Sequence, residues 1–311
     1  MNSSSTSIVN FSSLSMIAIV TIAVIVLKKN QQKQKIPKQL ILEHDVGFFS
    51  NVSVKFQKIV EFVNKYHKLP QVVDGKRQFS LYKRDPTVDV TFDFFKNYAM
   101  FTPVLQKKFN FKQKIPYNES YQYRDYSKIY QFPKILPLFN AYFTPSDLVI
   151  KKVQEIKAKY SIEPDNCIGV YFRGTDKKTE TAIPSYQVFY DKVKNVYLEK
   201  NKEENKNLKL FLQTDTAQFM DFFNKNKYDW IKDENIIIVN ENSTSYTTAG
   251  IHNEKLPEEN YKDIFNLFAT FLLLAKCKYY ICSSGNCSAI MMLYRGNGNN
   301  VYQFLNDRWL R

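Results

Sequence analysis

The second half of the chain alternates short apolar runs with segments whose apolar residues recur at helical spacing. The apolar runs are CIGVYF, LKLFLQT, NIIIVN, KYYICSS and NNVYQFL. The segments between them are PSYQVFYDKVKNVYLEK, AQFMDFFNKN, YKDIFNLFATFLLLAK and CSAIMMLYRG. Apolar strands that are separated by helices are typical of a parallel sheet covered on both faces. With right-handed crossovers, this half of the chain is predicted to be Rossmann-like.

The first half is less regular. A short apolar strand is predicted to run into Gly47, followed by a helix that Ser50 or Asn51 caps and by a second strand in KLPQVVD. Residues 75–140 are rich in aromatic residues and proline and show no regular period. The helical period returns in SDLVIKKVQEIKAKY, where Ser146 is predicted to be the cap. The first half thus predicts a strand–loop–helix–strand unit and one further helix.

Residues 8–27 form the one strongly apolar segment, which is long enough to cross a bilayer at ~1.5 Å per residue. A secretory signal peptide is disfavoured, because no Lys or Arg precedes the segment and no small-x-small cleavage site follows it. A buried helix would have no sequential element to pack on. We expect four parts: a membrane anchor (1–30), a stem (31–40), an N-terminal α/β half (41–150) and a C-terminal Rossmann-like half (151–311).

Charge gives a second indication of membrane topology. The segment after the apolar stretch, KKNQQKQKIPK, carries five Lys, and the segment before it carries none. The positive-inside rule then places the body of the protein in the cytoplasm.

The chain has a formal net charge of +14, which fits a solvated basic surface, a phosphate-bearing ligand or nucleic acid. The Lys residues are spread along the whole chain without a basic stripe interleaved with aromatic residues, so nucleic acid is not the expected partner. The three His and four Cys residues do not show the spacing of a metal site. One disulfide among Cys277, Cys282 and Cys287 stays open as an alternative to free thiols.

Polar groups follow three of the predicted strands. They are Arg173-Gly174-Thr175-Asp176-Lys177, Thr214-Asp215-Thr216 and Ser283-Ser284-Gly285-Asn286. Ligands of open parallel sheets lie beyond the carboxyl ends of the strands, where these groups would meet. An Arg fork can clamp diphosphate oxygens, a Ser-rich turn at a helix start can bind an anion, and Asp215 can accept a hydrogen bond from a ribose or an exocyclic amine. Each turn alone is also an ordinary helix start or surface turn, and no Walker or GxGxxG loop is present.

These motifs resemble those of a known family. IGVYFRGTDKKTETA resembles the first motif of α1,6-fucosyltransferases and their O-fucosyltransferase relatives, LFLQTDTAQF resembles the second, and KYYICSSGNCSAIMMLYRG resembles the third. GFFSN with the following helix and KLP resembles the Gly-x-x-x-Asn opening loop of the wider superfamily. The chain is also similar to glycosyltransferase-like proteins of large DNA viruses of algae.

The resemblance implies a GT-B-like α/β fold, in which two Rossmann-like halves face a cleft, here preceded by a transmembrane helix. It also implies an inverting, metal-independent transferase that uses GDP-fucose as the donor, with no further cofactor and with a glycan or glycoprotein as the acceptor. The half at 41–150 would lie on the acceptor side, and the half at 151–311 would bind the nucleotide sugar. The family works on the lumenal side of the Golgi or endoplasmic reticulum, in conflict with the Lys distribution.

The resemblance also assigns roles to residues. Arg173 would bind the β-phosphate and assist departure of GDP, and Glu180 would be the general base if one residue is deleted after Lys177. Asp176 and Lys177 would organise the motif and the acceptor side, with Lys177 counted among the catalytic residues and Asp176 among those that bind the donor. Asp215 would hold the guanine or ribose. The remaining donor-binding residues are Thr214, Ser283, Ser284, Gly285 and Asn286, and the acceptor-side cleft residues are Gly47 and Asn51.

Two departures from the family motif leave alternatives open. Tyr171 stands where the family has His, and Gly174 stands where the family has a second Arg. A catalytically inactive membrane protein that binds a nucleotide sugar or a glycan is one alternative, and a transferase of a different sugar is another. A membrane-tethered basic protein that binds nucleic acid would leave all three strand-end motifs unexplained.

Overall fold

The structure, a computed structural model, describes residues 36–311 except for 109, 132, 175–181 and 242–254, and Lys38–Arg311 form one compact unit. The expected membrane anchor lies outside the described residues. Within the described part of the chain, no helix is long and apolar enough to cross a membrane. The first strand starts at Gln39, so the folded body begins inside the range expected for the stem.

The second half contains a six-stranded sheet in the order β5-β4-β3-β6-β7-β8, parallel except for its last pair. The strands are β3 (Cys167–Phe172), β4 (Lys209–Thr214), β5 (Ile236–Ile237), β6 (Tyr279–Ser283), β7 (Val301–Leu305) and β8 (Arg308–Leu310). All five strands predicted in this half are present, and the α/β class is confirmed. The antiparallel strand β8 was not predicted.

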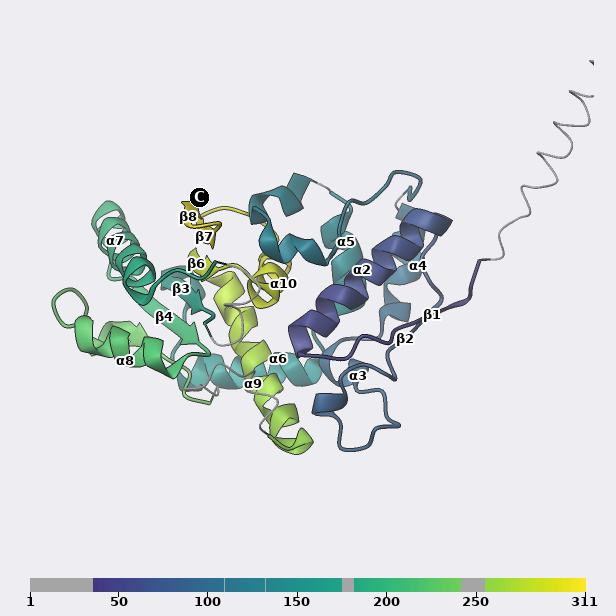
Figure 1. Ribbon diagram of the computed structural model, residues 1–311, viewed down its shortest axis with the longest axis horizontal. Helices are drawn as coiled ribbons and strands as arrows, with labels where there is room; N and C mark the ends of the chain where they lie inside the picture. Colours follow the sequence, from purple (N-terminus) through teal and green to yellow (C-terminus); the bar gives the residue numbers. More distant parts are fainter. Residues whose placement is uncertain (1–35, 109, 132, 175–181, 242–254) are drawn as a thin grey trace, which may run out of the picture. The chain divides into compact units, whose positions relative to one another are not determined.

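Helices cover both faces of this sheet (Figure 1). The helices are α7 (Tyr186–Glu204), α8 (Ala217–Asn226), α9 (Pro257–Lys276) and α10 (Asn286–Arg295). Side chains of α7 and α8 pack with Ile168 and Val170 of β3 in one hydrophobic cluster. The alternate β3 residue Tyr171 belongs to the other cluster, with α9 and α10. Successive strand residues point to opposite faces, so β3 contributes to both cores.

The first half begins with β1 (Gln39–Ile41), α2 (Phe48–Tyr66) and β2 (Val72–Asp74), and the two strands pair in parallel. This arrangement confirms the predicted strand–loop–helix–strand unit. The predicted cap was wrong, because α2 begins at Phe48 after Gly47 and not at Ser50 or Asn51. The Asn51 side chain instead accepts from the amide of Val46 at 3.0 Å and donates to its carbonyl at 2.9 Å, which holds the turn before the helix.

The irregular aromatic region forms short helices around the same core as α9 and α10. The elements are η1 (Ser80–Tyr82), α3 (Thr91–Phe94), η2 (Tyr98–Met100), α4 (Thr102–Lys108), η3 (Glu119–Tyr123), η4 (Tyr126–Gln131) and α5 (Ile135–Phe143). Phe48 of α2 lies 4.8 Å from Phe94 and 5.5 Å from Phe268 of α9, measured between ring centroids. One aromatic core therefore extends from the first half of the chain to the sheet.

Helix α6 (Asp147–Lys159) follows at the boundary expected between the two halves. The Ser146 hydroxyl accepts from the amide of Val149 at 3.2 Å, which confirms the predicted cap. Short 3₁₀ turns η5 (Pro164–Asn166) and η7 (Asp233–Asn235) lead into β3 and β5. Among the described residues before β3, the only strand pairing within a sheet is that of β1 with β2.

Candidate functional site

An ion pair lies at the carboxyl edge of the sheet. Arg173 Nη1 is 3.0 Å from Asp215 Oδ2, and the two side chains are 17% and 9% exposed. Strands β3 and β4 stay paired to their last residues, Phe172 and Thr214. The residues that follow therefore emerge next to each other. Because the pair is largely shielded from water, its attraction is screened less than that of a surface pair.

Further hydrogen bonds orient the Asp215 carboxylate. Its Oδ1 accepts from the Gly174 amide at 2.9 Å and from the Thr216 hydroxyl at 3.0 Å. The Thr214 hydroxyl accepts from the Thr216 amide at 3.1 Å, so this side chain stabilises the turn rather than facing Arg173. A carboxylate with a charged donor on one oxygen and neutral donors on the other is fixed in direction, which suits a group that must position a cation.

The third strand end joins this network through Ser283. The Ser283 hydroxyl accepts from the backbone amide of Arg173 at 2.9 Å. Arg173, Asp215 and Ser283 thus come together from β3, β4 and β6. Three other residues expected here, Asp176, Lys177 and Glu180, lie outside the described residues, as does Thr175.

Gly174 has no room for a side chain. A Cβ atom built there would lie 2.6 Å from Phe172 Cε1 and 2.6 Å from Thr216 Oγ1. Phe172 is in the core and Thr216 is hydrogen-bonded to Asp215, so neither neighbour moves away cheaply. This packing leaves no room after Arg173 for the second Arg that the resemblance would imply.

The Tyr126 hydroxyl hydrogen-bonds to the backbone of the turn from β6 to α10. The hydroxyl accepts from the Gly285 amide at 3.0 Å and donates towards the Gly285 carbonyl at 3.1 Å. Gly285 has a φ of +153°. The Tyr126 hydroxyl therefore already occupies one amide that was expected to bind a diphosphate. Sequence reasoning missed Tyr126, since it is one of many aromatic residues in an irregular region.

The other side chains of this turn differ in what they contact. The Ser284 hydroxyl donates to the Phe304 carbonyl at 2.7 Å and accepts from Gln303 Nε2 at 2.9 Å, so it ties the turn to β7. Asn286 is buried at the start of α10, and its Oδ1 atom has no hydrogen-bond partner among the described residues.

Gly47 and Asn51 lie at the start of α2. Asn51 is fully buried in the loop contacts described above, and Gly47 precedes Phe48, whose amide donates to the Tyr82 hydroxyl at 2.9 Å. Burial raises the pKa of Tyr82, and the positive charge of Arg173 opposes this rise. The start of α2 and the Arg173 edge therefore share Tyr82 as a neighbour.

A cavity of about 480 Å³ opens beside Gly174. It is lined by Phe172, Gly174, Ala182, Ile183, Pro184, Ser185 and Tyr186. The cavity is within the size range of small-molecule sites. Burial, followed by the negative charge of Asp215, raises the pKa of Tyr186. An aromatic ring beside the ion pair offers a stacking surface for a base, a role that sequence reasoning did not assign to Tyr186.

A second cavity, of about 270 Å³, lies between the loop after η1 and the start of α9. It is lined by Tyr82, Arg84, Asp85, Val88, Val90, Asp93 and Tyr261. The Tyr261 hydroxyl donates to Asp93 Oδ2 at 3.0 Å. Burial and then the Asp93 carboxylate raise the pKa of Tyr261 to about 12. Tyr82 lines this cavity, and its pKa is affected by the charge of Arg173.

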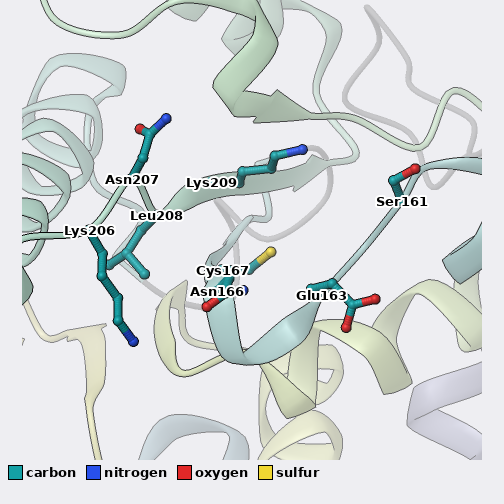
Figure 2. Close-up of a pocket in the computed structure, with 8 residues that line it drawn as sticks. All are labelled: Ser161, Glu163, Asn166, Cys167, Lys206, Asn207, Leu208 and Lys209. Carbon is teal, nitrogen blue, oxygen red and sulfur yellow. The ribbon is translucent and has the colours of Figure 1, made fainter.

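A third cavity, of about 330 Å³, lies where β3 and β4 begin, at the edge of the sheet opposite to Arg173 (Figure 2).

Tyr171, which stands where the resembled motif has His, is a core residue, with its ring 4.8 Å from that of Phe271. In the described part of the chain, no group of three or more His, Cys, Asp or Glu side chains is placed to hold a metal ion.

Comparison with models of known protein families and with curated proteins finds no match.

Proposed function

We propose that this protein is an inverting, metal-independent glycosyltransferase that transfers fucose from GDP-fucose to a glycan or glycoprotein acceptor. The observation that carries the proposal is the meeting of Arg173, Asp215 and Ser283 at the carboxyl edge of a parallel sheet. Ligands of open α/β sheets bind at this edge. A guanidinium that a carboxylate holds in place is suited to a diphosphate, because its fork matches two phosphate oxygens.

The donor would bind between the ion pair and the cavity beside Gly174. The guanine would stack on Tyr186, and Asp215 would hold the ribose or guanine while it orients Arg173. Arg173 would contact the β-phosphate, and its charge would stabilise the GDP that leaves. Asn286 would add its unpartnered acceptor at the start of α10.

The acceptor would lie in the second cavity, whose residues come from the first half of the chain and from α9. Carboxylates accept hydrogen bonds from sugar hydroxyls, and aromatic rings pack against the C–H faces of sugars. The general base would be Asp93 or Glu180. Asp93 is an acidic group of the N-terminal half and accepts a hydrogen bond from the Tyr261 hydroxyl. The deprotonated hydroxyl would attack the anomeric carbon in line, on the side opposite to GDP.

The proposal includes a GT-B-like pairing of two halves, at 41–150 and 151–311. It also includes a membrane anchor at 1–30 and a stem at 31–40. The folded body would lie either in the lumen of the Golgi or endoplasmic reticulum, as the resemblance implies, or in the cytoplasm, as the Lys distribution implies. Glycosylation of Asn118 in cells would identify the lumen, since its side chain begins an N-x-S/T sequon.

The test is release of radiolabelled fucose from GDP-fucose by the full-length protein, with and without a mixture of glycoprotein acceptors. Transfer that needs Arg173 and is unaffected by Arg77→Lys, an exposed Arg paired with Glu43, supports the proposal. No release or transfer of fucose, together with transfer from a different labelled nucleotide sugar in a parallel assay, would overturn the donor assignment.

One observation favours a second candidate, a protein that binds the nucleotide sugar without reaction. Gly174 replaces a family Arg and cannot hold a side chain, so the site has one cation fewer at its described edge. Tight binding of GDP-fucose with neither transfer nor hydrolysis would identify this alternative.

A further inference from the structure

Two cysteines that are far apart in the sequence meet at the amino end of the sheet. Cys167 is the first residue of β3, and Cys277 follows α9. A Cβ atom built on Gly169 would lie 3.0 Å from Cys277 Cβ and 3.1 Å from its sulfur. The Cys277 side chain therefore lies over Gly169. Cys167 and Gly169 share one face of the strand, so the two thiols are neighbours.

The surroundings of the two thiols differ. The neighbouring Cys277 side chain lowers the pKa of Cys167, with smaller contributions from a backbone hydrogen bond and from the charge of Lys209, while burial opposes this shift. The Cys277 thiol donates to the Leu273 carbonyl at 3.6 Å. Burial raises the pKa of Cys277 well above its ordinary value. The thiolate is the nucleophilic form, so Cys167 is the better nucleophile of the pair.

Cys167 also lies in the wall of a cavity. Although its exposed fraction is only 1%, it lines the third cavity, together with Ser161, Glu163, Asn166, Lys206, Asn207, Leu208 and Lys209. Figure 2 shows its sulfur directed towards the middle of this group of residues. The remaining two cysteines, Cys282 and Cys287, are buried and line none of the cavities described above.

We propose that Cys167 is an oxidation site for small disulfides that enter this cavity, and that Cys277 completes the reaction by forming a Cys167–Cys277 disulfide. In the structure all four cysteines are free thiols, which is the reduced form of this pair. The pairing differs from the one left open on sequence grounds, which grouped Cys277 with the two cysteines nearest to it in the chain.

The chemistry is a two-step exchange with a low-molecular-weight disulfide such as oxidised glutathione. The Cys167 thiolate attacks one sulfur of the disulfide, whose S–S bond breaks, and the first glutathione leaves as a thiolate that takes up a proton. Cys277 then loses its proton and attacks the Cys167 sulfur, and the second glutathione leaves and is protonated. The protein pair is oxidised by two electrons, and one disulfide is reduced to two thiols.

The product would connect the end of α9 to the start of β3, the strand that leads to Arg173. Such a crosslink closes a long loop, which restricts the unfolded chain more than the folded one. The oxidised protein is therefore expected to have a higher Tm than the reduced protein.

The test is equilibration of the full-length folded protein in buffers of reduced and oxidised glutathione, followed by unfolding in denaturant that contains N-ethylmaleimide and by peptide mapping. We expect a peptide that links Cys167 to Cys277, while Cys282 and Cys287 are recovered as alkylated thiols. Absence of the linked peptide in fully oxidised glutathione, or a link that includes Cys282 or Cys287, would overturn the proposal.

Two variants test the order of the steps. Cys277→Ser should stop at a mixed disulfide between Cys167 and glutathione, and Cys167→Ser should leave Cys277 unmodified. Modification of Cys277 in Cys167→Ser at the wild-type rate would show that Cys167 is not the entry site. Cys282→Ser is the matched control for replacing a buried thiol, and a native Tm for each variant confirms that it is folded.

Discussion

The guanidinium of Arg173 lies 3.0 Å from the carboxylate of Asp215, so an ion pair connects the end of β3 to the end of β4. The Asp215 carboxylate also binds the Gly174 amide and the Thr216 hydroxyl, and the Arg173 amide binds Ser283. The direction of the guanidinium is thus set before any ligand arrives. A group that is already oriented loses little freedom when it binds an anion.

Asp215→Asn tests whether the carboxylate orients Arg173. The substitution removes the negative charge beside a partly buried guanidinium, and we expect a cost of about 2 to 4 kcal/mol in the free energy of unfolding. Urea denaturation measures this change. Asp233→Asn, which alters an exposed partner of Lys227, is the control and should cost less than about 1 kcal/mol. An equal cost in both variants would contradict the proposed role of Asp215.

Gly174→Ala tests the packing that excludes a second Arg. The new methyl group would lie 2.6 Å from both Phe172 and Thr216, so we expect a loss of about 1 to 3 kcal/mol of stability. Gly285→Ala is a contrasting variant, because a Cβ there meets no atom within 4 Å, although the backbone has a φ of +153°. Shortening the Phe172 side chain, as in Phe172→Leu, should relieve part of the Gly174→Ala clash but none of the Gly285→Ala strain.

Tyr126→Phe tests the support behind the β6–α10 turn. The variant keeps the ring and removes the hydroxyl that binds both the amide and the carbonyl of Gly285. Two buried backbone groups lose a partner, which should cost about 1 to 3 kcal/mol. Thermal unfolding measures the loss. Hydrogen exchange at the Gly285 amide should also become faster, and an unchanged rate would show that the hydroxyl does not protect this turn.

Lys55 gives a prediction about pH. The side chain is buried on α2 and donates to the Thr91 hydroxyl at 3.2 Å. Burial lowers the pKa of Lys55 to about 8, against the opposing charges of Asp89 and Asp74. Between the folded pKa and the higher unfolded pKa, the unfolded chain holds a proton that the folded protein releases. The free energy of unfolding therefore rises with pH in this window.

The measurement compares wild-type protein with Lys55→Met by urea denaturation at several pH values. From about pH 7 to about pH 9.5, the wild-type protein should gain roughly 2 kcal/mol relative to the variant. Below the folded pKa both states are protonated, so the difference should be independent of pH there. A difference that stays constant through the alkaline range would show that Lys55 does not release its proton.

The sheet could be predicted because each of its longer strands has a recognisable local sequence pattern. CIGVYF and KYYIC are apolar on both faces and end in polar turns, and both are strands in the structure. The three-residue strand β8 has no such signal, since its pairing with β7 arises from the tight turn at Asn306 and Asp307, where φ is positive. Short antiparallel edges are set by the turn that precedes them.

The irregular region could not be predicted, because distant contacts determine its shape. Tyr126 binds Gly285 over a separation of 159 residues. The backbone amide of Tyr126 donates to the side-chain oxygen of Gln303, 177 residues away. The neighbouring thiols of Cys167 and Cys277 are a similar case, since nothing in the local sequence of either places the other beside it. Local patterns indicate elements and their ends, and tertiary packing decides which polar groups meet.

The measurement that tests the central claim most directly is nucleotide binding by calorimetry with the full-length protein. GDP, UDP, ADP and CMP are compared on the wild-type protein, on Arg173→Lys and on Arg77→Lys. We predict that GDP binds the wild-type protein most tightly, that Arg173→Lys weakens this binding by at least about tenfold, or 1.4 kcal/mol, and that Arg77→Lys leaves it unchanged. Preference for UDP, or equal GDP affinity in wild-type protein and Arg173→Lys, would contradict a GDP-sugar site at this edge of the sheet.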